Sequence, residues 1–164
     1  MPSEEGTKKV GGESKSGSGE APARILIAED DLQSVELLEA YLADTGYEIK
    51  TTTDGDATLR EAQQWQPDVI LLDIMMPKIS GFEVCKRLRA NPASRTIGIV
   101  MITALDQSSD VERAVDVGTD DFLTKPINKT ELLLRIRSLL KSRQNKGNLE
   151  RSLAYIEAVE RGEK

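Results

Sequence analysis

The chain has 164 residues, of which 38% are hydrophobic and 30% charged, a balance typical of a soluble globular protein with one domain and extra terminal sequence. A net charge of −6 disfavours nonspecific binding to nucleic acid, and no apolar run approaches the ~18 residues needed to span a bilayer. The single cysteine, Cys85, excludes an intrachain disulfide, and the absence of histidine excludes a phosphohistidine on this chain. Because no signal peptide is recognisable, we expect a cytoplasmic protein.

Residues 1–22 are dominated by Gly, Ser, Glu and Lys, and Val10 is their main bulky apolar residue. Such a segment buries too little apolar surface to offset its chain entropy, so we predict that it is disordered. The composition favours a leader or vector-derived tail over a functional docking arm.

Strand and helix signals alternate five times from Ala23 onward. Strands are predicted at 24–28, 47–52, 69–73, 99–102 and 121–124. Helices are predicted from four apolar patterns and their stop signals: Val35, Leu38, Tyr41 and Leu42 before Gly46; about 56–65 before Pro67; Phe82, Cys85 and Leu88 before Asn91-Pro92; Val111, Ala114 and Val115 before Gly118. This alternation predicts an α/β fold, a doubly wound parallel sheet buried on both faces.

The last predicted helix begins near Lys129 and continues to about Gln144. A break is expected at Gly147-Asn148, followed by a short amphipathic stretch with Leu149, Leu153, Ile156 and Val159 on one face. We therefore predict a domain at 23–142 and a helical extension at 143–164 that is too short for an output domain of ordinary size. The extension is either a self-association or docking element or an inert, frayed tail.

Polar side chains follow four of the predicted strands in a characteristic order. Glu29-Asp30-Asp31 follow the first, Asp73 ends the third, Thr103-Ala104 follow the fourth, and Lys125-Pro126 follow the last. A buried strand that ends in an aspartate presents that carboxylate at the mouth of an α/β sheet. Taken singly, such residues are ordinarily turn or capping residues, and the signal lies in their combination.

This order and spacing resemble the receiver domain of two-component response regulators, over roughly residues 23–142. The resemblance implies the chemotaxis-regulator-like, flavodoxin-like (βα)5 fold with five strands in the order 2-1-3-4-5. It implies that Asp73 is the phosphoacceptor and that Lys125 and Thr103 contact the phosphoryl group. Thr103 and Phe122 would form the conformational switch, although Phe122 is alternatively a core aromatic.

Strands 1 and 3 are neighbours in such a sheet, so three carboxylates would crowd one cleft, and at least one should have a raised pKa. A hard divalent cation such as Mg²⁺ resolves this repulsion. By resemblance, Asp30 and Asp73 ligate Mg²⁺ directly, Glu29 acts through water, and the Met75 backbone carbonyl supplies another ligand. Asp31 is expected to be a helix N-cap or an exposed charge and not a ligand.

The implied function is a signalling switch that catalyses only its own phosphorylation and dephosphorylation. A histidine kinase or phosphotransfer protein would donate the phosphoryl group, and the face of the fourth helix and fifth strand would bind a downstream protein; a homodimer is possible. One alternative is a haloacid-dehalogenase-type phosphatase, which needs a second aspartate where Met75 stands. The others are a DNA-binding transcription factor and the receiver portion of a larger regulator whose output module, such as a cyclic-dinucleotide enzyme, is absent here.

Overall fold

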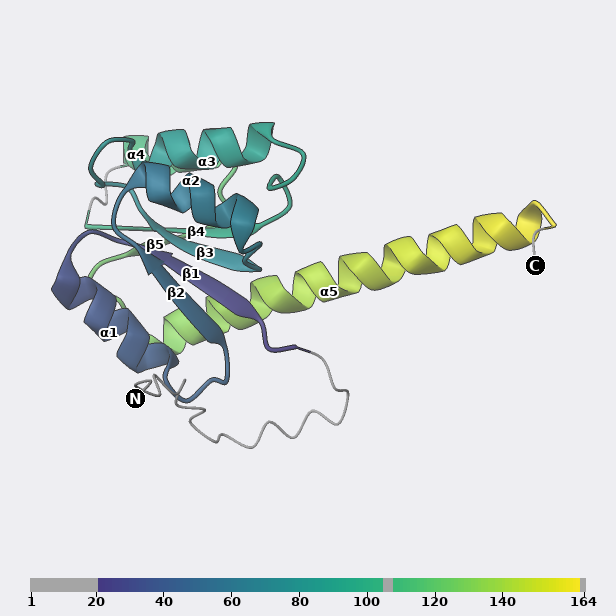
Figure 1. Cartoon of the computed structure of the whole chain (residues 1–164), viewed down its shortest axis with the longest axis horizontal. Coiled ribbons are helices and arrows are strands. Elements are labelled where there is room, and N and C mark those ends of the chain that lie inside the picture. Colours follow the sequence, from purple (N-terminus) through teal and green to yellow (C-terminus); the bar gives the residue numbers. More distant parts are fainter. Residues whose placement is uncertain (1–20, 105–107, 163–164) are drawn as a thin grey trace, which may run out of the picture.

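The computed structural model describes residues 21–104 and 108–162, so most of the segment predicted to be disordered lies outside these ranges. Five parallel strands form one sheet in the order β2-β1-β3-β4-β5 (Figure 1). The strands are β1 (Arg24–Ala28), β2 (Glu48–Thr52), β3 (Val69–Asp73), β4 (Gly98–Thr103) and β5 (Asp121–Thr124). The helices are α1 (Leu32–Leu42), α2 (Gly55–Gln64), α3 (Gly81–Ala90), α4 (Ser108–Asp116) and α5 (Lys129–Glu160). The predicted doubly wound architecture and its strand order are confirmed.

The sheet is buried between two layers of helices. Alternate strand residues face opposite ways: Leu26, Ile70 and Met101 pack with α2, α3 and α4, whereas their sequence neighbours pack with α1 and α5 (Figure 1). Every residue of β3 and β4 is buried, while the edge strands β2 and β5 are partly exposed. This explains why the central strands read as unbroken apolar runs.

Polar side chains cap the helices at their N-termini. Asp31, Asp54, Ser80 and Asn128 each accept a hydrogen bond from the backbone N–H three residues later. The expected capping role of Asp31 is therefore confirmed. Each cap satisfies a backbone donor that the helix itself leaves unpaired.

The helix predicted from Val111, Ala114 and Val115 is present as α4, in which Ala114 is fully buried and the two valines are exposed. The prediction about the last helix is wrong. In α5, no break occurs at Gly147-Asn148, and one helix of 32 residues crosses the predicted domain boundary. A glycine inside a helix costs only about 1 kcal/mol relative to alanine, which is too little to end a long helix by itself.

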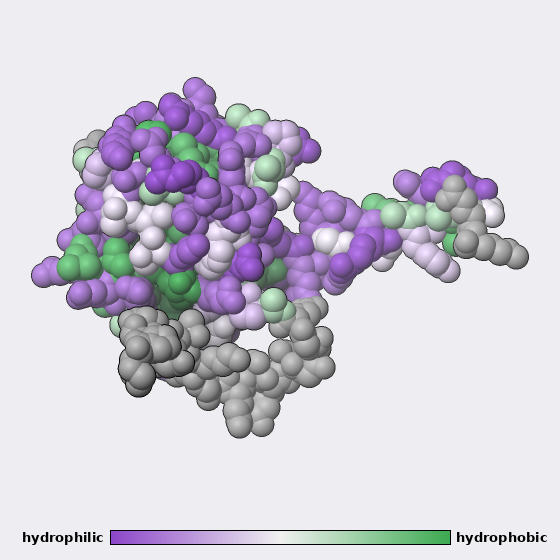
Figure 2. Space-filling view, viewed as in Figure 1, coloured by the Kyte–Doolittle hydropathy of each residue, from purple (hydrophilic) through white to green (hydrophobic). Residues whose placement is uncertain are grey.

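The C-terminal half of α5 extends beyond the globular part of the molecule (Figure 1). Apolar side chains stay exposed there, and they gather toward the far end of the helix (Figure 2). Among the described residues, no helix combines the length and apolar character needed to cross a bilayer.

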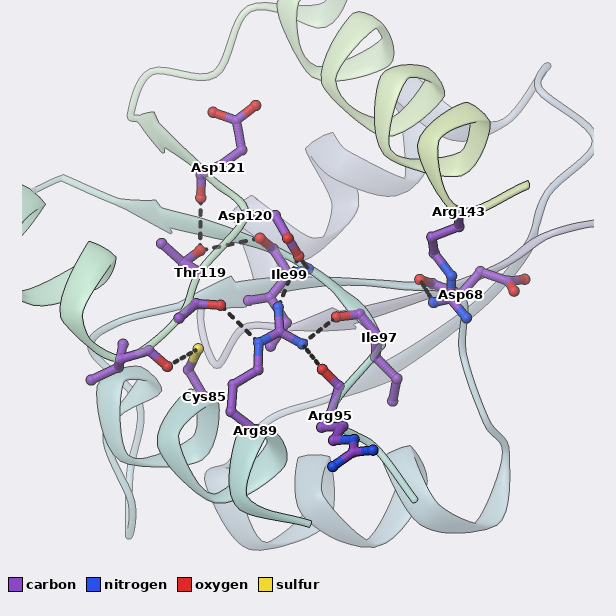
Figure 3. Close-up of polar contacts among 12 residues, drawn as sticks. Asp68, Cys85, Arg89, Arg95, Ile97, Ile99, Thr119, Asp120, Asp121 and Arg143 are labelled. Atoms are coloured by element: carbon purple, nitrogen blue, oxygen red, sulfur yellow. Dashed lines mark hydrogen bonds and ion pairs between the residues drawn. The ribbon is translucent and has the colours of Figure 1, made fainter. Parts of the chain in front are cut away.

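Arg89 joins three segments on the face covered by α3 (Figure 3). Its guanidinium donates to the carbonyls of Gly118 (2.7 Å) and Ile97 (2.6 Å) and pairs with Asp120 at 2.8 Å. Asp120 also accepts from the backbone N–H of Ile99 at 2.8 Å. These bonds tie α3 to the start of β4 and to the turn before β5, so they fix the two strands whose far ends carry Thr103 and Lys125.

Two glycines allow the turn after β3 to pack closely. A Cβ on Gly81 would meet the Asp73 carbonyl oxygen and lie 2.8 Å from the Ile74 Cα, and a Cβ on Gly55 would lie 2.7 Å from Ile79. Contacts under 3.0 Å are essentially never seen for real Cβ atoms. The first turn of α3 can therefore lie directly against the end of β3, where Asp73 stands.

We expect Gly81→Ala to lower the free energy of unfolding by about 2–4 kcal/mol, because the added methyl group must displace backbone rather than a flexible side chain. Urea unfolding at equilibrium measures this loss. Gly147→Ala is the control, since a Cβ there meets no atom within 4 Å and should leave the midpoint of the domain unchanged. Equal midpoints for wild type and Gly81→Ala would contradict the prediction.

Candidate functional site

The sequence-predicted site residues come from four strand ends at one edge of the sheet. Glu29 and Asp30 follow β1, Asp73 ends β3, Thr103 ends β4, and Lys125 follows β5. Because β1 pairs with β3, β3 with β4 and β4 with β5, all in parallel, their C-terminal ends are neighbours. The structure thus brings together residues that lie up to 96 positions apart in the sequence.

Three carboxylates form a compact cluster. Oxygen atoms of Glu29, Asp30 and Asp73 all lie within 4.8 Å of one another. Glu29 and Asp73 are buried, with 2% and 5% of their surface exposed, whereas Asp30 is exposed. The backbone N–H of Asp31 donates to Glu29 Oε2 at 3.2 Å, which helps to orient that carboxylate.

Lys125 supplies the positive charge beside this cluster. Its Nζ lies 2.6 Å from Glu29 Oε1 and 4.0 Å from Asp73 Oδ2, so the closer ion pair is with Glu29. The sequence did not predict this ion pair. It identified Lys125 only as a contact of a phosphoryl group on Asp73. Burial acts to lower the pKa of Lys125, but the hydrogen bond to Glu29 and the charge of Asp73 raise it overall.

The pKa values of the two buried carboxylates, Asp73 and Glu29, are shifted in opposite directions. Burial, the hydrogen bond with Glu29 and the Glu29 charge raise the pKa of Asp73 to about 7, and the nearby Lys125 offsets only part of this. Burial also acts to raise the pKa of Glu29, but hydrogen bonds with Asp73 and Lys125 lower it. Near neutral pH Asp73 is therefore partly protonated, whereas Glu29 is ionised.

This donor set fits a hard divalent cation. Clustered carboxylate oxygens at the mouth of a sheet are the ligands that Mg²⁺ prefers, and an exposed Asp30 leaves room for waters on the ion. Burial is the main cause of the raised pKa of Asp73, and the negative charge of Glu29, which one lysine does not fully balance, adds to it.

The remaining predicted residues lie around the cluster. Thr103 is fully buried, and its carbonyl accepts from the Lys125 N–H at 2.8 Å. Phe122 is half-buried and packs against the core cluster that contains Ala114 of α4. The Met75 side chain is exposed, with 66% of its surface accessible, while its backbone N–H acts to lower the pKa of Asp73. The Lys125–Pro126 peptide bond is cis.

Comparison with known proteins gives one consistent result. The family model of the response regulator receiver domain matches residues 25–137. Over 117 residues the chain is 47% identical to the response regulator PleD of Caulobacter vibrioides, a match that covers 71% of this chain and 26% of PleD. Over 118 residues it is 43% identical to the DNA-binding dual master transcriptional regulator RpaA of Synechocystis, covering 72% of this chain and 49% of RpaA. The chain therefore spans about a quarter and about half of these relatives.

Solved structures agree with the sequence relatives. The receiver domain of the sensor histidine kinase PA1611 from Pseudomonas aeruginosa is 30% identical, with a TM-score of 0.66, and the match covers 74% of this chain and 97% of that one. That structure contains a magnesium ion coordinated in its active site cleft.

The raised pKa of Asp73 predicts a stability effect that depends on pH. Without divalent cations at about pH 8, we expect Asp73→Asn to raise the free energy of unfolding by about 2–3 kcal/mol, because the asparagine carries no buried charge beside Glu29. The folded-state pKa lies above the ordinary value of 3.8, so wild type loses stability as pH rises from about 4 to about 7, and the advantage of asparagine develops over that window. The lowered pKa of Glu29 offsets part of this gain.

Urea unfolding in EDTA at acidic and alkaline pH measures the difference between the two proteins. Asp44→Asn is the control, because it removes the same charge from an exposed position. A gain that is equal at both pH values, or a loss at alkaline pH, would contradict the role assigned to the buried charge.

Proposed function

The chain belongs to the family of response regulator receiver domains, and we propose that it is a switch operated by phosphorylation of Asp73. The observation that carries this proposal is the buried Asp73 carboxylate, clustered with Glu29 and Asp30 and 4.0 Å from Lys125. The proposed phosphoryl donor is the phosphohistidine of a histidine kinase or phosphotransfer protein, since this chain contains no histidine.

The chemistry begins with attack of an Asp73 carboxylate oxygen on the phosphorus of the donor. A phosphorus–oxygen bond forms, the phosphorus–nitrogen bond breaks, and the donor imidazole leaves with the bonding electron pair and takes up a proton. The product is an acyl phosphate on Asp73. Its hydrolysis by water returns the carboxylate and releases inorganic phosphate, so the domain acts catalytically only on itself.

Glu29, Asp30, Asp73 and the Met75 backbone carbonyl are the groups we propose to hold Mg²⁺, with Glu29 acting through water. When bound, the ion supplies positive charge that keeps Asp73 deprotonated and neutralises the phosphoryl oxygens. The raised pKa of Asp73 supports this proposal, because a carboxylate that is protonated near neutral pH is a poor nucleophile until further positive charge arrives.

Lys125 and Thr103 are proposed to contact the phosphoryl group. Lys125 is already 4.0 Å from Asp73, so it can transfer its ion pair from Glu29 to a phosphoryl oxygen with a small movement. The Thr103 hydroxyl, at the end of the adjacent strand β4, would donate to another oxygen. Movement of Thr103 would let Phe122, which is half-buried against the core cluster that contains Ala114 of α4, turn further inward. This turn would change the α4–β5 face that a downstream protein binds.

We expect acetyl phosphate and Mg²⁺ to add one phosphoryl group to the wild-type protein and none to Asp73→Asn. The asparagine is nearly isosteric but offers no nucleophilic carboxylate. Intact-mass spectrometry, with and without hydroxylamine to cleave the acyl phosphate, measures the label. Asp44→Asn should label like wild type, and full hydroxylamine-sensitive labelling of Asp73→Asn would show that another residue is the phosphoacceptor.

Lys125→Ala should bind Mg²⁺ at least as tightly as wild type, because Glu29 loses the cation that competes for it at 2.6 Å. Its phosphorylation rate should fall by a factor on the order of 100, since one positive contact to the transferred group is lost. Calorimetric titration of Mg²⁺ and timed mass spectrometry separate the two effects.

Lys129→Ala is the matched control for that comparison, because Lys129 is an exposed lysine four residues along the chain. It should match wild type in both assays. A wild-type labelling rate in Lys125→Ala would show that Lys125 is a structural partner of Glu29 only.

A further inference from the structure

One face of α5 stays exposed along almost the entire helix. At 100° per residue, the side chains of this face lie within an arc of about 60°. They are Arg135, Ser138, Ser142, Leu149, Leu153, Ile156 and Glu160, and all of them are exposed. The face is distinct from the buried side of α5, where Leu132 and Ile136 pack against the sheet. We call it the exposed face.

The exposed face changes character along its length. Its first half, beside the globular part, carries the small residues Ser138 and Ser142. Its second half, on the protruding part of the helix, carries the large apolar residues Leu149, Leu153 and Ile156, each between 49% and 59% exposed. Small residues opposite large ones allow two helices to interlock, so the two halves are complementary in shape.

The charges of the two halves of α5 are also complementary, because one half is basic and the other is acidic. No acidic residue lies between Glu131 and Glu150, and that stretch contains Arg135, Arg137, Lys141, Arg143 and Lys146. Residues 147–160 carry three glutamates and one arginine, a net charge of −2. A parallel pair of these helices would place the basic stretch against itself, whereas an antiparallel pair places it along the acidic one.

We propose that a second copy of this chain covers the exposed face, through antiparallel pairing of the two α5 helices centred between Gly147 and Asn148. In this register Ser142 lies opposite Leu153 of the second copy, and Arg135 lies opposite its Glu160. The seam from Arg135 to Glu160 is about 37 Å long, and the globular parts lie at its two ends. The pairing also covers apolar side chains of the protruding half of α5 that its own domain leaves exposed.

The apolar contact is tested by Leu153→Glu, with Tyr155→Glu as its control. Tyr155 is 71% exposed in the same segment but lies about 200° around the helix from Leu153, away from the seam. Light scattering over a dilution series should give a dimer for wild type and Tyr155→Glu and a monomer for Leu153→Glu. A wild type that is monomeric at every concentration, or two variants with the same mass, overturns the proposal and leaves the face to a different protein.

The orientation is tested by exchanging one pair of charges. Arg135→Glu and Glu160→Arg should each weaken dimerisation about tenfold, because a favourable contact made twice by symmetry becomes repulsive. The double variant should return to within about twofold of wild type. The two residues are about 37 Å apart along one helix, so such a rescue requires contact between copies.

Arg135 also pairs with Asp121 at 3.4 Å within its own domain, so the unfolding midpoint of each variant is measured separately from its dimerisation. If the wild type is a dimer but the double variant does not recover wild-type dimerisation, the antiparallel register is wrong. This outcome is independent of phosphorylation, which is assayed on Asp73 alone.

Discussion

The buried contact between Glu29 and Asp73 is the interaction on which the site depends. Two carboxylates with 2% and 5% of their surface exposed share one cluster, and Lys125 balances Glu29 at 2.6 Å but reaches Asp73 only at 4.0 Å. The pKa of Asp73 therefore rises to about 7, and the fold keeps a group that is costly to ionise at the end of its central strand. Because Asp73 is costly to ionise, positive charge added by a cation or by movement of Lys125 has a large effect on its protonation.

The backbone is arranged to hold that unfavourable contact in place. Parallel pairing of β1, β3 and β4 aligns their C-terminal ends, and complete burial of β3 and β4 leaves Asp73 little freedom to swing toward water. Gly81 lets the first turn of α3 close on the Asp73 carbonyl, so the residues after β3 are fixed as well. A looser sheet edge would let the two carboxylates separate, and their electrostatic coupling would fall with distance.

The sequence predicted the parts of the structure that have local causes. Central strands are apolar without alternation because both faces are covered, and Asp31 was recognisable as a cap from its position before a helix. The residues at the strand ends were identified through their order along the chain, and the structure brings them to one edge. The contacts that the sequence did not indicate have nonlocal causes. The Lys125–Glu29 pair depends on side-chain reach across the sheet, and the bonds made by Arg89 depend on where two distant turns meet.

The sequence did not predict the continuity of α5, because Gly147 was considered without its helical neighbours. This continuity changes how the two ends of the molecule are related. Lys125 is followed by Pro126 and Ile127, and then by Asn128, which caps α5. Three residues thus separate Lys125 of the site from the first residue of a 32-residue helix. The same helix therefore packs on the sheet through Leu132 and Ile136 and also presents the exposed face beyond the globular part.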